Sequence, residues 1–333
     1  METVLVREYR AEVIECVHSG HIAIVGEGGQ LKGYAGDPGF VSFTRSAAKP
    51  LQAIPGIRGG IAEHYQLSQA EIALMTASHC GESYHISALE SISSKIGIGE
   101  GTMICATSYP LDRNSRVHAI RGLGKRKLYH NCSGKHLGML SYSKLKGLPL
   151  EEYAGPEHPV QREIIDTIAY MADVIPESIR LGTDGCGLPV FALPLTALAG
   201  AYLKLACPGL IGDHATRKAV TTITAAMTAH PEMVSGYGRL DSILLEDENI
   251  IAKGGFKGVY CFGLRRERLG IAFKILDGSE EEWGLIVHRI LKQIGYSNGN
   301  TLEKLSAAFS GNIYNDGGTK VGLAAAEFQL EII

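Results

Sequence analysis

A serine stands three residues before a lysine in the segment Arg45-Ser46-Ala47-Ala48-Lys49-Pro50, a spacing that could serve nucleophilic catalysis. Because residues i and i+3 of a helical turn share one face, the Lys49 amine could reach the Ser46 hydroxyl. A serine needs a base to attack, and a lysine that burial keeps neutral can accept its proton. Pro50 is disfavoured inside a helix, so we predict a turn at the very start of a helix, of α or 3₁₀ type. The alternative is a helix-capping serine beside a solvated lysine.

Two further segments could contribute to the same centre. The segment 76–82 (TASHCGE) separates two predicted helices, and such a loop can direct polar side chains like Ser78 into a cleft. Alternatively, Ser78 caps the next helix. Lys253 precedes two glycines beside a late strand, and an ordinary lysine at a strand end is its alternative. The order S-x-x-K, loop serine, K-x-G is similar to that of penicillin-binding enzymes and class A β-lactamases, where these parts form one acyl-transfer centre.

Cysteines and an aspartate in two other segments could bind a metal ion or a substrate. Cys132 lies in the segment 130–136 (HNCSGKH), and Asp184 and Cys186 lie in 183–187 (TDGCG). Two thiolates and a nitrogen ligand would suit Zn²⁺, although the spacing matches no zinc-finger pattern. Buried, inert cysteines are the alternative. Asp184 could hold a substrate ammonium or form an Asx-turn.

The elements that must position these residues follow a β, then α, then β order. Strand-like patterns at both ends of the chain flank a long middle part with helical signals, so neither end completes a sheet alone. We therefore predict one α+β domain over residues 1–333, with an antiparallel sheet built from the N- and C-terminal strands, flanked by helices and carrying a large helical insertion. The sheet layer is expected at approximately 1–45 and 236–333, and the helical middle at approximately 46–235.

Local signals give some of the expected elements in more detail. They are an antiparallel meander over 4–43, a capping box at 68–71 (SQAE), a helix that ends at Gly97, strands at 250–251, 258–263 and 269–276, a helix opened by 279–282 (SEEE), and a closing strand within 320–333.

Composition excludes several classes of protein. Lys+Arg 32 against Asp+Glu 35 gives a net charge of -3 with interspersed signs, so we expect no nucleic-acid partner. A run of about 20 apolar residues is missing, so we expect no membrane span. The seven cysteines are odd in number and form no C-x-x-C pair, which favours reduced thiols. The N-terminus lacks the apolar core of a signal peptide. We therefore expect a cytoplasmic protein.

Many short motifs in order make the sequence similar to the L-asparaginase II family, the rhizobial-type or class 3 asparaginases. The resemblance covers nearly the whole chain. The matching segments are 15–20 (ECVHSG), Gly36-Asp37-Pro38, 45–53 (RSAAKPLQA), 77–82 (ASHCGE), 130–136 (HNCSGKH), 184–189 (DGCGLP), 229–232 (AHPE) and 238–241 (GRLD).

The resemblance implies a fold like that of the serine β-lactamases and serine-dependent glutaminases, a homodimer, and hydrolysis of L-asparagine to L-aspartate and ammonia. It implies two Ser-Lys tandems in one site. In the first tandem, Ser46 is the nucleophile and Lys49 its base. In the second, Ser78 pairs with Lys253.

The resemblance also implies binding roles for other residues. Cys132, Lys135 and Cys186 would be zinc ligands, with zinc not expected to activate the nucleophile, and Asp184 would hold the substrate α-ammonium. Candidate substrate contacts are Arg45, His79 and His136.

One stretch departs from the family pattern. After the lysine the family tends to show Gly-Ala-Glu-Gly, whereas this chain has Phe256 and Lys257 in place of the alanine and the glutamate. The departure keeps open a non-catalytic or weakly active amino-acid-binding protein. Two further candidate functions are those of a serine-dependent glutaminase and of a penicillin-reactive acyl-transfer enzyme.

Overall fold

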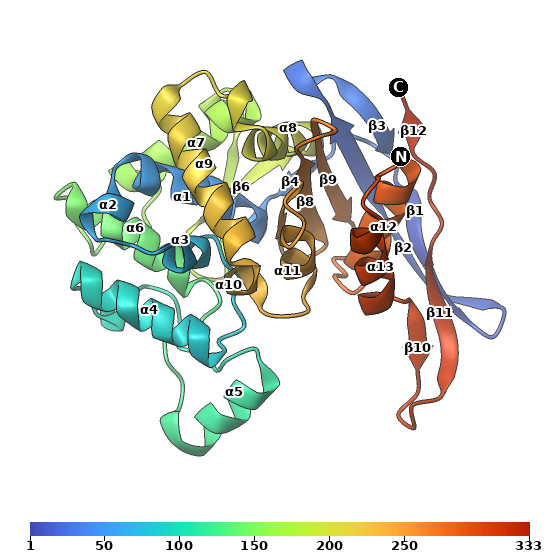
Figure 1. Ribbon diagram of the computed structural model, residues 1–333, viewed down its shortest axis with the longest axis horizontal. Helices are drawn as coiled ribbons and strands as arrows, with labels where there is room; N and C mark the ends of the chain where they lie inside the picture. Colours follow the sequence, from blue (N-terminus) through green and yellow to red (C-terminus); the bar gives the residue numbers. More distant parts are fainter.

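The computed structural model describes residues 1–333, leaving aside the side chain of Leu123. Its main sheet has nine strands within this described part (Figure 1). They are β1 (Thr3–Arg10), β2 (Val13–Val25), β3 (Leu31–Ala35), β7 (Ile250–Gly254), β8 (Val259–Leu264), β9 (Leu269–Ile275), β10 (Asn312–Tyr314), β11 (Lys320–Ala326) and β12 (Glu331–Ile332).

Strands from the two ends of the chain alternate in this sheet. The order is β10-β11-β1-β2-β9-β8-β7, and β3 pairs with both β2 and β12. The antiparallel pair β2–β9 places Ile22 opposite Phe273, and the pair β1–β11 places Glu8 opposite Ala324. The predicted α+β fold, with an antiparallel sheet shared by the N- and C-terminal strands, is confirmed.

A second sheet has two of its three strands, β5 and β6, within the part that we predicted to be helical. It joins β4 (Val41–Phe43), β6 (Pro189–Pro194) and β5 (Arg180–Thr183) in that order. The prediction of a single meander over 4–43 is wrong for β4, because the backbone turns at Gly36 with φ +71° and β4 then pairs with β6. The Thr44 N–H extends this pairing by donating to the Phe191 carbonyl at 2.8 Å.

The helices occupy mainly the middle of the chain. They are α1 (Lys49–Arg58), α2 (Ile61–His64), α3 (Gln69–Met75), α4 (Ser83–Ile96), α5 (Arg113–His118), α6 (Ser133–Leu145), α7 (Pro159–Ala172), α8 (Leu195–Ala206), α9 (His214–Ala229), α10 (Pro231–Ser235), α11 (Leu240–Leu245), α12 (Trp283–Gln293) and α13 (Gly299–Ala308). Shorter turns are η1 (Glu27–Gly29), η2 (Arg45–Ala48), η3 (Glu100–Thr102), η4 (Ala119–Leu123), η5 (Pro176–Ser178) and η6 (Pro208–Leu210).

The predicted helix boundaries hold at α3 and α4 and fail at α12. Ser68 and Glu71 form the expected capping box, and Gly97 ends α4 in the left-handed conformation. Helix α12 begins only at Trp283, without a side-chain cap. Ser279 does not cap it, because it lies four residues before the first helical residue, in a turn where its N–H donates to Asp277 Oδ1. No helix within the described residues combines the length and apolar character that a membrane crossing requires.

Two hydrophobic clusters cover the opposite faces of the main sheet. Neighbouring residues of β2 divide between them, because side chains of a strand alternate: Ala23 belongs to the cluster under α8 and Ile22 to the cluster under α12. Figure 1 shows most helices on one side of the sheet and α12 and α13 on the other.

Helix α8 packs very closely on β8 and β9. A Cβ added at Gly270 would lie 1.9 Å from the Ala199 carbonyl oxygen, and one at Gly263 would lie 2.3 Å from that of Tyr202. Glycine is therefore required at both strand positions for the helix to reach its place. This close contact fixes the sheet, including β7, against the helical part.

Candidate active site

A cavity of about 660 Å³ opens between the helical part and the main sheet, and most of the predicted site residues line it. Among its lining side chains are seven from the sequence analysis: Arg45, Ser46, Ser78, Cys132, Asp184, Cys186 and Lys253.

Ser46 lies in the 3₁₀ turn η2, directly before α1, as the position of Pro50 predicted. The preceding residue, Arg45, has φ +49°, a left-handed conformation that is strained for a residue with a side chain. The turn leaves Ser46 at the cavity wall, whereas the Lys49 side chain is completely buried behind it.

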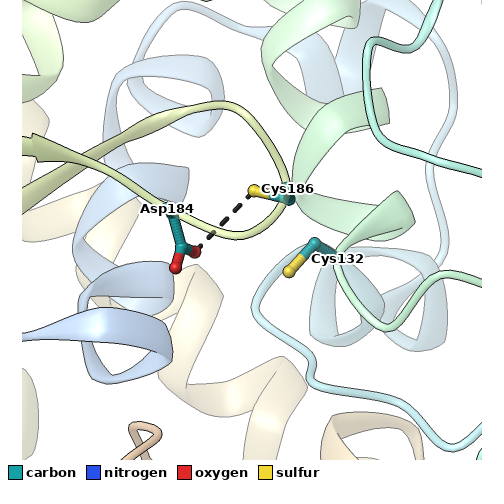
Figure 2. Close-up of side chains that lie close together, drawn as sticks. All are labelled: Cys132, Asp184 and Cys186. Atoms are coloured by element: carbon teal, nitrogen blue, oxygen red, sulfur yellow. Dashed lines mark hydrogen bonds between the residues drawn. The ribbon is translucent and has the colours of Figure 1, made fainter.

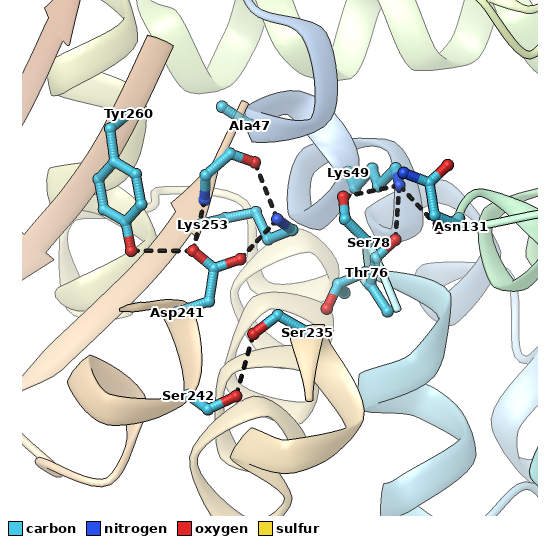
Figure 3. Close-up of polar contacts among 12 residues, drawn as sticks. Ala47, Lys49, Thr76, Ser78, Asn131, Ser235, Asp241, Ser242, Lys253 and Tyr260 are labelled. Atoms are coloured by element: carbon cyan, nitrogen blue, oxygen red, sulfur yellow. Dashed lines mark hydrogen bonds and ion pairs between the residues drawn. The ribbon is translucent and has the colours of Figure 1, made fainter. Parts of the chain in front are cut away.

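The Lys49 amine is held by three oxygen atoms. Its Nζ donates to the carbonyls of Ala77 at 2.6 Å and Asn131 at 3.2 Å, and lies 3.0 Å from Ser78 Oγ (Figure 3). Burial lowers the pKa of Lys49 to about 8, and the ammonium groups of Lys135 and Lys253 act in the same direction. A substantial neutral fraction near physiological pH gives this amine the properties of a general base.

The observed contacts differ from the two expected Ser-Lys pairs. Among the described residues, no hydrogen bond joins Ser46 to Lys49 or Ser78 to Lys253; Lys49 contacts Ser78 instead. The physical reason is that the Ala77 and Asn131 carbonyls draw the Lys49 amine toward the Ser78 loop.

Lys253 is bound to Asp241, a residue whose role the sequence analysis did not assign. Its Nζ lies 2.6 Å from Asp241 Oδ2, and both side chains are buried. The other oxygen, Asp241 Oδ1, accepts hydrogen bonds from the Gly254 N–H at 2.8 Å and the Tyr260 hydroxyl at 2.9 Å (Figure 3). The only sequence signal for a role of Asp241 was its position at the end of the family-like GRLD segment.

Arg45 and Asp184 form an ion pair at the cavity wall. The Arg45 Nε and Nη2 atoms lie 2.8 and 2.7 Å from Asp184 Oδ1. The Phe256 ring covers the Arg45 guanidinium, with 4.9 Å between the guanidinium carbon and the ring centroid. Phe256, one of the two departures from the family pattern, thus adds an aromatic ring against Arg45 of this pair. Lys257 has φ +57° and its N–H donates to Glu280 Oε1 at 3.0 Å.

Cys132, Cys186 and Asp184 lie close enough together to share one ion, since one ligand atom of each lies within 4.8 Å of the others (Figure 2). Lys135 joins them, with its Nζ 3.3 Å from Cys186 Sγ and 3.8 Å from Asp184 Oδ2. A hydrogen bond from Cys186 lowers the pKa of Cys132, with Lys49 and Lys135 assisting against burial. Two sulfur atoms, one of them favoured as a thiolate, and an amine fit the donor preference of Zn²⁺.

Burial alone would lower the pKa of Lys135, but the neighbouring cysteine sulfurs and Asp184 raise it. Proton release from Lys135 would therefore have to accompany metal binding.

His79 and His136 lie outside the cavity. His79 is fully buried, with Nε2 2.8 Å from Ser133 Oγ, and His136 Nδ1 lies 2.5 Å from the Tyr153 hydroxyl. Burial lowers the pKa of both imidazoles well below the usual value. In this structure they support the segments around the cavity and do not line it, so the expected substrate contacts are not formed by these two side chains.

The fold can be compared with solved structures. A beta-lactamase from Mycobacterium bovis aligns at 14% identity over 82% of this chain and 94% of that protein, with a TM-score of 0.40. Mglu in its native form aligns at 15% identity over 84% of this chain and 66% of that protein, with a TM-score of 0.38.

At the level of sequence, no protein of curated function matches the chain. The profile of the L-asparaginase II family, in contrast, matches residues 6–326, almost the whole chain and every residue of the cavity described above. The chain belongs to the L-asparaginase II family.

Proposed function

We propose that this protein hydrolyses the side-chain amide of L-asparagine to L-aspartate and ammonia through an acyl-enzyme. Membership of the family supports an amidohydrolase that acts on a small-molecule amide. The observation that carries the proposal is the buried Lys49 amine, with a pKa of about 8, at 3.0 Å from a serine hydroxyl that lines the cavity.

The three contacts of Lys49 can be kept by a neutral amine if Ser78, which accepts from Nζ in the structure, becomes the donor. A neutral amine has two N–H donors and one lone pair. With the two donors used by the carbonyls of Ala77 and Asn131, the lone pair is left for the Ser78 hydroxyl. Ser78 then relays a proton to Lys49, because a hydroxyl can donate and accept at once.

In the proposed mechanism, Ser46 attacks the amide carbon and its proton passes through Ser78 to Lys49. Lys49 returns the proton to the leaving ammonia, and water then hydrolyses the β-aspartyl ester by the same route. Asp241 holds the Lys253 ammonium at the cavity wall, where its positive charge stabilises the negative charge that develops on the substrate oxygen.

The Arg45–Asp184 pair supports a free amino acid as the substrate. A zwitterionic α-amino acid offers a carboxylate to Arg45 and an ammonium to Asp184, so it can replace the pair without leaving either charge unpaired. Asparagine and glutamine differ by one methylene, which is worth only about 1–3 kcal/mol in a pocket.

Cys132, Lys135 and Cys186 would hold a zinc ion, with Asp184 at the edge of the same site. A bound zinc ion would compensate the thiolate charge and fix the loop between β5 and β6 against the start of α6. We assign it no step of the reaction.

Ammonia release from asparagine and glutamine tests the proposal. We expect Ser46→Ala to abolish turnover and the acyl-enzyme, and Ser78→Ala to lower kcat by about 10²- to 10⁴-fold, as loss of acid-base assistance does. Ser235→Ala is the matched control, because Ser235 lines the same cavity but bonds to Ser242, and it should keep its activity.

Different results would point to a different function. Undiminished turnover by Ser46→Ala would exclude that nucleophile, and activity lost on chelation would favour a metal-bound water in its place. Asparagine binding without ammonia release by the native chain would favour an amino-acid-binding protein, in line with the Phe256 ring over Arg45.

A further inference from the structure

A second group of metal-ligating side chains lies apart from the cavity. It joins Glu8 of β1, His18 of β2 and Glu282, the residue that precedes α12, and one ligand atom of each lies within 4.8 Å of the others. None of the three lines the cavity, and none belongs to the Cys132–Cys186 group. The neighbouring strands β1 and β2 thus meet a residue from the C-terminal part of the chain at one point.

The distances within this group suit a shared ion better than direct hydrogen bonds. His18 Nε2 lies 3.4 Å from Glu8 Oε1 and 3.5 Å from Glu282 Oε1. A charge-assisted N–H···O bond would be shorter, at about 2.7–2.9 Å. Ligand atoms that each lie about 2.1 Å from one tetrahedral zinc ion are separated from one another by about 3.4 Å.

Two buried polar atoms of the group form no hydrogen bond among the described residues. They are His18 Nε2 and Glu282 Oε2. The Glu282 side chain is only 3% exposed and that of His18 only 12%, so water reaches them poorly. Leaving such atoms unsatisfied costs free energy, which an ion would recover.

The opposite nitrogen of His18 is already oriented by a carboxylate. His18 Nδ1 lies 2.7 Å from Asp277 Oδ2, an arrangement that fixes the ring and directs Nε2 toward Glu8 and Glu282. Histidines that bind metals in proteins are usually held in this way through their second nitrogen.

The charges of the group also favour a cation. Glu8, Glu282 and Asp277 supply three carboxylates around a single imidazole. The alternative cation is a protonated His18, whose Nε2 lies 3.4 Å from Glu8 Oε1 and 3.5 Å from Glu282 Oε1. A protonated ring would nevertheless donate from Nε2, and Nε2 forms no hydrogen bond.

We propose that Glu8, His18 and Glu282 bind a divalent transition-metal cation such as Zn²⁺, with Asp277 orienting His18. Imidazole nitrogen and carboxylate oxygen are ordinary ligands of Zn²⁺, and the imidazole disfavours Mg²⁺. The site would leave a fourth position for water.

The site would also fix one wall of the cavity. Glu280, Glu281 and Trp283 line the cavity, whereas Glu282, between them, turns toward His18. An ion that binds Glu282 to β1 and β2 therefore anchors this wall segment to the main sheet.

Calorimetric titration with ZnCl₂ tests the proposal after removal of bound metal by EDTA. The Cys132→Ser/Cys186→Ser variant removes the thiolate group, and we expect it to bind one zinc ion per chain. Adding His18→Gln or Glu282→Gln to this variant should abolish that binding, and MgCl₂ should give no binding in any variant.

Two matched controls accompany these variants. Glu281→Gln changes the neighbouring glutamate, which faces the cavity, and His230→Gln changes a histidine that has a single carboxylate at 3.5 Å. Both should keep the zinc ion. If the double cysteine variant does not fold, the zinc content of the protein with native cysteines is measured instead. His18→Gln should then lower that content by one ion per chain. Unchanged zinc binding after His18→Gln in either background would overturn the proposal.

Discussion

Lys49 is a buried amine whose surroundings are supplied mostly by the backbone. Two of its three partners are the carbonyls of Ala77 and Asn131, from loops that precede α4 and α6. These carbonyls fix where the amine lies, and burial fixes its proton affinity. The position of the Lys49 amine therefore depends on both loops. Of its three partners, only the Ser78 hydroxyl can take part in proton transfer.

The pH dependence of turnover should report the protonation of Lys49. Because only the neutral amine accepts a proton, and burial lowers its pKa to about 8, kcat/KM should rise with pH and level off above about 8. Lys49→Arg should remove this rise along with most of the activity, since arginine stays charged.

Lys144→Arg is the control for that substitution. Lys144 Nζ also donates to two backbone carbonyls, those of Ile96 and Gly97, but away from the cavity. This variant should keep the native pH profile. A native profile that is flat between pH 6 and 10 would contradict the role of Lys49.

The sequence predicted which side chains gather in the site better than it predicted their contacts. Ser46, Ser78 and Lys253 line one cavity, as expected for residues of one centre. Their partners could not be predicted, because backbone carbonyls carry no residue-specific signal. Asp241 was visible only as the end of a matched motif, and nothing in the spacing connects it with Lys253.

At the scale of elements, the packing of α8 on β8 and β9 holds the sheet against the helical part. Gly263 and Gly270 allow this approach, because the helix backbone occupies the space where a Cβ would lie. Strand β7, which carries Lys253, pairs with β8. The position of Lys253 therefore depends on two glycines that do not contact the cavity.

Gly270→Ala should lower the free energy of unfolding by about 3 kcal/mol, at the upper end of the usual range for overpacking, since its Cβ meets the Ala199 carbonyl. Chemical denaturation measures the change. Gly200→Ala on α8 is the control: its Cβ meets nothing within 4 Å, so it should stabilise the protein by about 1 kcal/mol through helix propensity. Equal effects of the two substitutions would show that the close contact is not needed.

Elements with capping signals or with apolar runs free of proline were predictable, and others were not. The capping box of α3 and the glycine at the end of α4 act locally, so the sequence reports them. Strand β6 was missed because it begins and ends with proline, which counts against a strand in a sequence pattern. Strand β4 was expected in the N-terminal meander, and its three residues carry no signal for their pairing with β6.

At the scale of the whole molecule, the two hydrophobic clusters share the strands of one sheet. Residues of β2, β8 and β9 alternate between the two clusters, so neither cluster can lose its packing while the other keeps a complete sheet. From this arrangement we predict that the two faces of the sheet unfold together, as one domain.

Urea denaturation should therefore give one transition. Trp283, the single tryptophan, reports the region of α12 by fluorescence, and far-UV circular dichroism reports mainly the helices on the opposite face. We expect the two curves to coincide, as in two-state unfolding. Separate midpoints would mean that the two faces unfold as independent units.

The pairing of β2 with β9 has a consequence for biosynthesis. Ile24 of β2 lies opposite Ile271 of β9. This edge of β2 therefore stays unpaired while the ribosome adds about 250 residues, which takes about 12–50 s at cellular elongation rates. During this interval the growing polypeptide presents an open, apolar strand edge to the cell. The nascent chain should therefore depend on chaperones that shield such an edge until translation reaches its final quarter.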